Sequence, residues 1–288
     1  MALTELLFHG TPALALLAPD GARAMFSRYG GHVLSWQPAG GHGEQLYLSP
    51  RSGFDAGQAI RGGVPVVFPQ FSERGPLPRH GFVRTRSWQG HVAHSDSADG
   101  SATAVLGLID DAYTRAIWPH GFALALQLRV AGQTLEIGLQ CTNTDAQPWQ
   151  FMAALHTYLQ VSDCTQAQVS GLAGRSYWDA VDAQQQTQHD ALLRFGAEVD
   201  RVYAGVDGAV VLQETGVGGG RSVQVTHSGF TDIVIWNPGP QRCATLADMP
   251  PDGYRAMVCI ESGRIVQPVT LAPGQTWTGV QRLRLNHA

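Results

Sequence analysis

The sequence contains no lysine, and all 19 of its basic residues are arginine. Without a lysine amine the chain cannot form the Schiff bases on which one class of aldolases and the pyridoxal-phosphate enzymes depend, so both classes are excluded. It also has no basic tract and carries a net charge of −4, which argues against a nucleic-acid-binding surface. Arginine suits the recognition of phosphate or carboxylate, because its planar guanidinium presents a fork of N–H donors.

Cysteine is scarce and widely spaced. The four cysteines, Cys141, Cys164, Cys243 and Cys259, show no C-x-x-C spacing, which excludes a disulfide framework or a zinc ribbon and predicts buried free thiols. The histidines show no H-x-H spacing, so the metal site of a cupin would need scattered ligands. We therefore expect no metal and no cofactor.

Long hydrophobic runs are also missing. An apolar patch covers Ala13–Ala18, but no basic region precedes it, and Glu5 lies where one would be expected. This pattern predicts neither a signal peptide nor a transmembrane span, and from it we expect a cytoplasmic protein.

What the chain does contain is a series of short segments with period-2 hydrophobicity. Phe122–Val130 and Leu135–Cys141 alternate strictly around a short turn and predict a β-hairpin with one buried face. One short helix is expected from a cap at Asp110 or Asp111 through Trp118. Residues 163–180, Gln184–His189 and the segment ETGVGGGR are expected to be loops. Further strands are predicted at residues 22–37, Ala102–Ile109, Gln150–Val161, Ala209–Gln213, Ser222–Thr226, Asp232–Trp236, Met257–Glu261 and Val280–Leu285.

This pattern predicts an all-β fold, an antiparallel β-sandwich or super-sandwich. No linker marks a boundary, so residues 1–288 are expected to form a single domain.

The stretch Arg61–Trp88 has the composition of a polar ligand site. Arg61 precedes a glycine pair, and the apolar run Val64–Gln70 is broken by Pro65 and Pro69, which predicts an edge, a bulge or a loop threading the interior. A strand-like run follows, and at period 2 it would place on one face His80, Phe82, Arg84, Arg86 and Trp88.

Three further residues are candidates for chemistry. Glu261 ends the apolar run MVCI, and a carboxylate there is costly to bury unless something pairs with it or uses it. His156, in LHTYL, is either a reactive group or a histidine satisfied by a neighbouring strand. Asp200 is either functional or a partner of Arg201 or Arg175.

The segments RGGVPVVFPQF and LPRHGFVR resemble the hexose-6-phosphate mutarotases of the wider aldose 1-epimerase (galactose mutarotase-like) family. The likeness runs from about Arg61 to Gly279 and includes TLAPGQTWTG. It implies Glu261 as the general base on the anomeric hydroxyl and His156 as the general acid on the ring oxygen.

The resemblance also implies a set of substrate-binding residues. In it His80 and Asp200 hold sugar hydroxyls, Gln70 of FPQF belongs to the same group, and Arg61 and Arg84 accept the phosphate. Two positions depart from the pattern. Ser72 stands where a glycine is common, and Arg86 has no implied role, so we expect a solvated strand residue there rather than a third phosphate ligand.

We therefore expect an epimerase that interconverts the α and β anomers of a hexose 6-phosphate, with glucose 6-phosphate as the expected substrate. The alternatives are a β-sandwich glycoside hydrolase using Glu261 and Asp200 as its two carboxylates, and a sugar-phosphate-binding protein without activity. The expected partner is the small-molecule substrate, with no nucleic acid and no membrane. A monomer is expected, and a dimer is left open.

Overall fold

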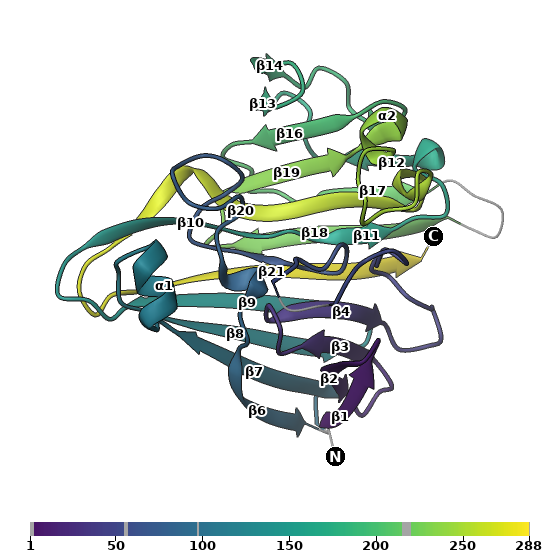
Figure 1. The fold of residues 1–288 in the computed structure, drawn as a ribbon. Coiled ribbons are helices and arrows are strands. Elements are labelled where there is room, and N and C mark those ends of the chain that lie inside the picture. The colour runs from purple at the N-terminus through teal and green to yellow at the C-terminus, as the bar shows by residue number, and fades with distance from the viewer. Residues whose placement is uncertain (1–2, 55–56, 97, 215–219, 288) are drawn as a thin grey trace.

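The computed structural model describes residues 3–54, 57–96, 98–214 and 220–287, and three antiparallel sheets make up most of it (Figure 1). The largest sheet has nine strands, which in spatial order are β15 (Leu193–Arg194), β12 (Ala167–Ser170), β17 (Val210–Glu214), β18 (Arg221–Ser228), β21 (Thr276–His287), β9 (Thr134–Asn143), β8 (Phe122–Ala131), β7 (Ser101–Ile109) and β6 (Gln89–Asp96).

An eight-stranded sheet faces it and carries most of the site described below. Its order is β14 (Gln184–Thr187), β13 (Ser176–Asp179), β16 (Val199–Tyr203), β19 (Asp232–Asn237), β20 (Met257–Leu271), β10 (Trp149–Leu155) and β5 (Val66–Val67), and β11 (Tyr158–Gln160) pairs with β20. The third sheet is a meander of β1 (Leu3–Phe8), β2 (Thr11–Leu17), β3 (Arg23–Ser27) and β4 (His32–Gln37).

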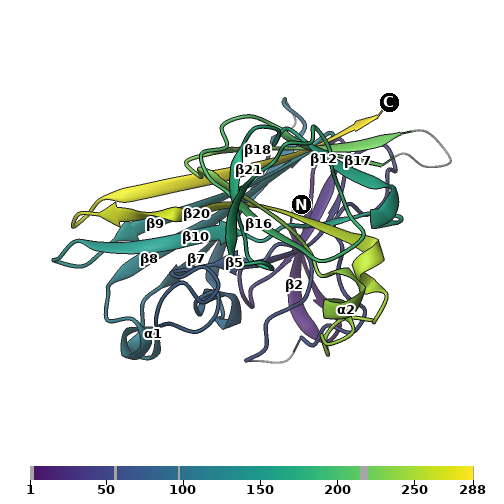
Figure 2. The same cartoon turned by 90° about the horizontal axis from the view of Figure 1, so that it is seen from above.

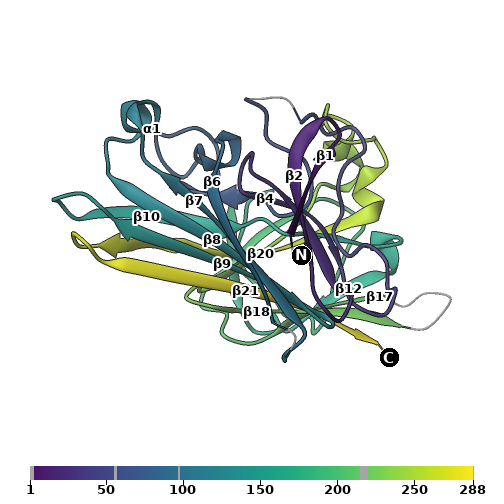
Figure 3. The same ribbon diagram turned by 90° about the horizontal axis from the view of Figure 1, so that it is seen from below.

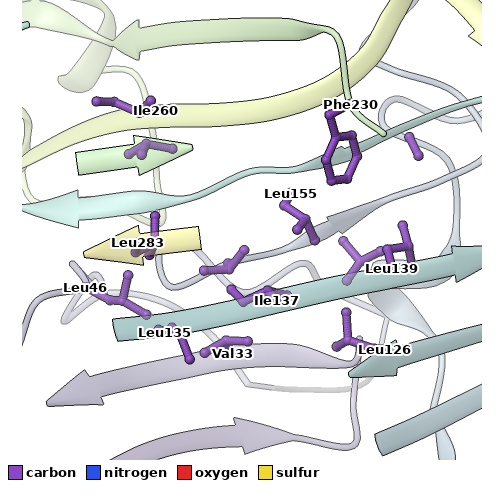
Figure 4. Packing of buried hydrophobic residues seen from close by; sticks show 14 of the residues in the cluster. Val33, Leu46, Leu126, Leu135, Ile137, Leu139, Leu155, Phe230, Ile260 and Leu283 are labelled. Carbon is purple, nitrogen blue, oxygen red and sulfur yellow. The ribbon is translucent and has the colours of Figure 1, made fainter. Parts of the chain in front are cut away.

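The sheets stack as layers around one large apolar core. β2 contacts β7 and β3 contacts β8, so the meander packs on the nine-stranded sheet, as Figures 2 and 3 show. Inward side chains of the three sheets meet between the layers (Figure 4), among them Val33 of β4, Ile137 of β9 and Ile260 of β20. Each such side chain contributes roughly 1.5–3 kcal/mol when it is fully buried. The predicted antiparallel all-β architecture is confirmed.

The hairpin predicted from strict alternation is confirmed as β8 and β9, which pair from Phe122↔Asn143 to Ala131↔Thr134. The predicted short helix is also present. It is α1 (Ala112–Ile117), which Asp111 caps by accepting a hydrogen bond from the Thr114 amide. The other helical segments are α2 (Gly239–Cys243) and the 3₁₀ turns η1 (Val83–Thr85), η2 (Cys164–Gln166) and η3 (Gly253–Ala256). No helix in the described ranges is long and apolar enough to cross a membrane.

The prediction of a strand over residues 80–88 is wrong. His80 and Gly81 both have positive φ, at 64° and 71°, and a turn followed by η1 replaces the strand. A Cβ at Gly81 would lie 1.9 Å from the Phe68 carbonyl oxygen, so this tight crossing requires glycine. The run Val64–Gln70 is confirmed as an edge, because its only strand is the two-residue β5 at the end of the eight-stranded sheet.

Two predicted loops contain strands. Residues 163–180 include η2, β12 and β13, and the glutamine-rich segment forms β14, which pairs with β13 from Ser176↔Thr187 to Asp179↔Gln184. β14 was missed because its side chains are polar, and at a sheet edge only the backbone has to pair. β12 and β13 lie inside their sheets and were missed because each is only four residues long. In ETGVGGGR, residues 215–219 lie outside the described ranges, while β17 and β18 on either side pair antiparallel. All four cysteines are free and buried, as predicted.

Candidate active site

A cavity of about 660 Å³ opens on the eight-stranded sheet and gathers most of the residues singled out from the sequence. Arg61, His80, Arg84, His156, Asp200 and Glu261 all line it, although up to two hundred positions separate them in the chain. Their neighbours in the wall include Phe71, Arg74, Arg79, Tyr158, Trp178, Glu198, Trp236, Arg242 and Asp248.

His156 and Glu261 are cross-strand neighbours. The pairs Leu155↔Ser262 and Tyr158↔Cys259 fix the register, which places His156 opposite Glu261. Side chains directly opposite one another on an antiparallel pair share a face and lie within reach. Here His156 Nε2 is 3.3 Å from Glu261 Oε1.

The local backbone explains why β10 ends just before His156. The Thr157 amide donates back to the Leu155 carbonyl at 3.0 Å instead of to β20, while the His156 amide donates to the Pro65 carbonyl at 3.0 Å on the side of β5. The imidazole stacks on the Tyr158 ring, with centroids 4.8 Å apart and planes 10° apart. The histidine is therefore held between a ring and a carboxylate.

The His156–Glu261 pair is buried but only partly satisfied. His156 is 8% exposed and Glu261 is 1% exposed, and neither His156 Nδ1 nor Glu261 Oε2 has a hydrogen-bond partner among the described residues. Native structures rarely leave buried polar atoms without a partner, so these two atoms need an explanation.

Burial also sets the charge of the pair. It raises the pKa of the Glu261 carboxyl, and the charge of Asp200 adds to this effect. Burial lowers the pKa of His156, and the positive charges of Arg61 and Arg84 lower it further. In the free site both groups therefore favour their neutral forms. The carboxyl therefore does not hold a charged imidazolium beside it in the free site.

His80 lies beside the pair, with its ring centroid 5.6 Å from that of His156. Its Nδ1 accepts a hydrogen bond from the Ser72 amide at 3.3 Å, so the proton of the neutral ring is on Nε2. Burial, with the charges of Arg84 and Arg79, lowers the pKa of His80 to about 2. This histidine is therefore a neutral donor.

Asp200 lies on β16, across the cavity floor. The ion pairs that the sequence offered it do not form, because Arg201 pairs with Asp179 and Arg175 pairs with Asp207. Burial, followed by the charge of Glu198, raises the pKa of Asp200 to about 6. A carboxyl held at this cost in a cavity is a candidate for ligand binding.

Arg61 lines the same cavity and is held by a hydroxyl and a carboxylate. Its Nη1 donates to the Tyr158 hydroxyl at 3.0 Å, and its Nε and Nη2 reach Asp248 Oδ2 at 3.1 and 3.0 Å. The guanidinium also lies 5.9 Å from the centroid of the Trp236 ring.

Arg84 is placed by η1 and is less well compensated. Its Nη2 donates to the Arg79 carbonyl at 2.8 Å, and no ion pair to Arg84 occurs in the described part of the chain. Burial and the nearby charge of Arg61 lower its pKa. A partly buried cation without a carboxylate partner favours an anion from solution.

Gln70 does not line the cavity. It is 3% exposed, and its amide binds the backbone of its own loop, donating to the Ser72 and Leu77 carbonyls and accepting from the Leu77 amide. It therefore shapes the rim loop of residues 72–79. Ser72 adopts φ 48°, the left-handed conformation that glycine favours, so the loop keeps that backbone shape without the glycine. Arg86 pairs with Asp111 at 2.5 Å, in a turn rather than on a strand.

One group of three side chains in the described ranges is close enough to share a metal ion. The ligand atoms of His156, Cys259 and Glu261 lie within 4.8 Å of one another. Burial raises the pKa of the Cys259 thiol well above its usual value, which disfavours the thiolate that a metal would need. We therefore do not assign these residues as metal ligands, and metal independence stays a prediction.

Sequence reasoning missed Tyr158, Trp236 and Asp248. Tyr158 lies two residues after His156, so the alternation of a strand would have placed both side chains on the same face. Trp236 was placed only as the end of a strand, and Asp248 lies in the irregular segment between α2 and η3, where no periodicity operates.

Comparisons with known proteins show the family to which the chain belongs. The family model described as "Aldose 1-epimerase" matches residues 12–284. A protein from Escherichia coli (strain K12) named "Putative glucose-6-phosphate 1-epimerase" is 38% identical over 83% of this chain and 79% of its own length. A protein of the same name from Cenchrus ciliaris is 33% identical over 87% of this chain and 78% of its own. A crystal structure titled as a "putative mutarotase" from Salmonella typhimurium superimposes with a TM-score of 0.88 at 30% identity, covering 100% of this chain and 94% of that one.

Proposed function

Because the chain belongs to the aldose 1-epimerase family, we propose that this epimerase interconverts the α and β anomers of hexose 6-phosphates, with glucose 6-phosphate as its substrate. One observation carries the proposal. Among the described residues, two polar atoms of the buried His156–Glu261 pair have no hydrogen-bond partner, and the pair shares a cavity with two arginines, of which Arg84 has no carboxylate partner there.

The unpartnered atoms fit an acid–base ring opening. Glu261 removes the proton from the anomeric hydroxyl while His156 donates a proton to the ring oxygen, and the ring opens to the aldehyde. Rotation about the C1–C2 bond then exposes the other face of the carbonyl. The reversed proton transfers close the ring as the other anomer, so both residues return to their starting states.

The arginines give a reason for a phosphorylated substrate. A sugar phosphate carries close to two negative charges at neutral pH, since its second pKa is about 6. Placed between Arg61 and Arg84, it offsets the positive charges that lower the pKa of His156. The single proton of the pair then shifts from Glu261 toward the imidazole, which leaves the carboxylate as base and the imidazolium as acid. Substrate binding thereby prepares the catalytic state.

The remaining wall residues suit a sugar ring. His80 presents an Nε2–H donor, Asp200 presents acceptor oxygens, and Trp178 and Trp236 add apolar ring faces. Neutral donors, carboxylates and aromatic faces together are the groups that bind sugar hydroxyls and C–H faces. Arg61 and Arg84 then bind the phosphate at C6.

The test is the rate of α/β interconversion, followed by NMR exchange spectroscopy for glucose 6-phosphate and for glucose, with and without protein. We expect acceleration in proportion to protein concentration and a kcat/KM at least tenfold higher for the phosphorylated sugar. Binding of glucose 6-phosphate without any acceleration would overturn the proposal and favour a sugar-phosphate-binding protein without activity.

A further inference from the structure

A buried polar bridge lies directly behind the His156–Glu261 pair. Successive residues of a strand point to opposite faces, so Thr157 and Ser262, the neighbours of the pair, point away from the cavity and into the apolar layer between the sheets. Both are fully buried. Leu155, Ile260 and Leu283 surround this region with apolar side chains (Figure 4).

Gln281 of β21, in the facing sheet, joins these two neighbours. Its Oε1 accepts from the Thr157 hydroxyl at 2.5 Å, and its Nε2 donates to the Ser262 hydroxyl at 2.9 Å and to the Ile260 carbonyl at 3.2 Å. Gln281 is 0% exposed and occupies an inward position of β21 where Leu283 and Leu285 continue the alternation. A single amide thus contacts the chain next to the acid and on both sides of the base.

The proton directions along this bridge are consistent from end to end. Thr157 donates to the amide oxygen, and the amide nitrogen donates to Ser262. Ser262 is 3.3 Å from His227 Nδ1, to which its hydroxyl can donate, because His227 Nε2 lies 2.7 Å from the Val206 carbonyl and carries the proton there. Each member of the bridge has a partner, so it has one favoured arrangement.

The bridge lies where the ladder between the two strands is interrupted. β10 stops at Leu155 and β11 starts at Tyr158, so the backbone between them has fewer ladder hydrogen bonds to β20 than a continuous strand would have. The Ile260 amide donates to the Thr157 carbonyl at 3.1 Å, but the Thr157 amide donates to the Leu155 carbonyl at 3.0 Å rather than back to Ile260. The Ile260 carbonyl accepts from the Gln281 amide instead. The spacing of His156 and Glu261 therefore needs support from outside their own sheet.

We propose that Gln281 is a positioning residue for the reaction, which uses its side-chain amide to fix His156 and Glu261 at their working separation through Thr157, Ile260 and Ser262. The proposal rests on the proposed function, because it assumes that these two residues are the acid and the base. Gln281 touches no substrate. Its effect is transmitted through the backbone of the two facing segments.

The test compares Gln281→Met with wild type on glucose 6-phosphate. Methionine keeps the length of the side chain and removes its polar atoms. A displacement of about 1 Å between reacting groups can cost on the order of a hundredfold in rate. We therefore expect kcat to fall about ten- to a hundredfold with KM changed less than about threefold, because the wall that binds sugar and phosphate is unaltered.

A second set of variants separates positioning from stability. Thr157→Val should lower kcat and Thr157→Ser should retain it, and Thr157→Val combined with Gln281→Met should be no slower than the slower single variant, since both break one bridge. Asn143→Leu is the matched control. It removes another fully buried amide, which donates to the Gln147 and Leu271 carbonyls at the far end of β20, and it should lower the melting temperature without lowering kcat.

Two outcomes would overturn the proposal: a folded Gln281→Met enzyme with kcat within about twofold of wild type, or an equal loss of kcat in Asn143→Leu. If Gln281→Met fails to fold, the Thr157→Val and Thr157→Ser pair decides the matter. His156→Asn measured in the same assay separates the two proposals. If His156→Asn retains full activity, the assignment of the acid has failed, whereas its loss beside an active Gln281→Met rejects only the bridge.

Discussion

Buried polar groups on the two faces of the segment Ile260–Ser262 differ in whether they have hydrogen-bond partners. On the core face, the Ser262 hydroxyl and the Gln281 amide have partners at each polar atom. On the cavity face, one residue away, Glu261 Oε2 and His156 Nδ1 have none in the described part of the protein. Glu261 is 1% exposed and Ser262 is 0% exposed, so the exposure of these two side chains does not explain the difference.

The contrast separates groups that hold the fold from groups that meet the substrate. A buried polar group without a partner costs about 1–3 kcal/mol, which a chain under selection for stability alone would remove. The core face avoids this cost with a closed bridge. The cavity face retains it, together with the uncompensated charge of Arg84, and this strain is expected where a ligand completes the site.

The largest expected effect concerns the unpartnered pair itself. Glu261→Gln keeps the shape of the side chain and removes its basicity, and His156→Asn removes the proton donor. General acid–base groups contribute about a hundred- to ten-thousandfold each, so we expect kcat on glucose 6-phosphate to fall at least a hundredfold in either variant. A folded Glu261→Gln enzyme that retains more than about a tenth of wild-type kcat would contradict the assignment.

Ser262→Ala extends this experiment to the core face. It leaves the Gln281 amide nitrogen without its hydroxyl acceptor, whereas Glu261→Gln changes a buried carboxyl of which one oxygen has no hydrogen-bond partner in the described part of the chain. We therefore expect the melting temperature to drop more for Ser262→Ala than for Glu261→Gln. The reverse order, by calorimetry, would break the distinction between the two faces.

The arginines should produce the next largest effect, and only for a phosphorylated sugar. A charge-assisted contact of this kind is worth roughly 1.5–3 kcal/mol, so Arg61→Ala and Arg84→Ala should each lower kcat/KM for glucose 6-phosphate about ten- to a hundredfold. Turnover of glucose should change little. Arg86→Ala, which removes an arginine paired with Asp111 in a turn rather than lining the cavity, is the control. Equal losses on both sugars would show that the arginines only hold the loops.

Asp200 offers a test through pH. Its negative charge raises the pKa of Glu261, so Asp200→Asn should lower that pKa and keep the base ionised to lower pH. The acidic limb of the kcat/KM profile should therefore move to lower pH. The second ionisation of the substrate phosphate is common to both enzymes and cancels in the comparison. An unmoved limb, or one displaced to higher pH, would count against Glu261 as the base.

The same substitution should stabilise the protein. The pKa of Asp200 is about 6 in the folded state against about 3.9 in an unfolded chain, so the native state binds the proton more tightly. Ionised Asp200 therefore costs the native state about 2–3 kcal/mol above pH 6, and this cost disappears below about pH 4. Asp200→Asn should raise the melting temperature at pH 7.5 and leave it unchanged at pH 4. A lower melting temperature at pH 7.5 would indicate a structural role.

The smallest expected effect is that of chelation. The acid–base mechanism needs no electrophilic ion, so dialysis against a strong chelator should leave kcat unchanged. Loss of activity that a divalent cation restores would instead assign His156, Cys259 and Glu261 as ligands, whose atoms lie close enough for this.

The sequence predicted the layers well because alternation is a local signal. One side of each of the strands β8 and β9 is buried and the other is less buried, and apolar residues alternate in the sequence in the same way. The strand predicted for residues 80–88 is wrong because the alternation of residue types carries no information about backbone dihedral angles. The positive φ angles of His80 and Gly81 turn the chain within this run. β14 was missed because at a sheet edge its polar side chains need bury nothing.

For the site, residue chemistry could predict which groups matter but not which ones touch. Glu261 stood out as a carboxylate in an apolar run. Its register opposite His156 depends on a pairing between segments a hundred residues apart, which no local pattern contains. The partner of Arg61 was missed for the same reason, since Asp248 lies 187 positions away in an irregular segment. Gln70 was predicted to bind the substrate from the resemblance alone. Its hydrogen bonds to the backbone of its own loop could be seen only in the structure.

The most direct test of the whole account is a crystal structure of the Glu261→Gln variant with glucose 6-phosphate, because slow turnover should preserve the complex. We expect the anomeric hydroxyl within about 2.6–3.2 Å of residue 261, the ring oxygen within the same reach of His156, and the phosphate between Arg61 and Arg84. The ligand should then supply hydrogen-bond partners for His156 Nδ1 and for the side-chain atom at the position of Glu261 Oε2, which have none among the described residues. A sugar bound with its phosphate on Arg74 and Arg79, or with C1 away from residue 261, would contradict the account.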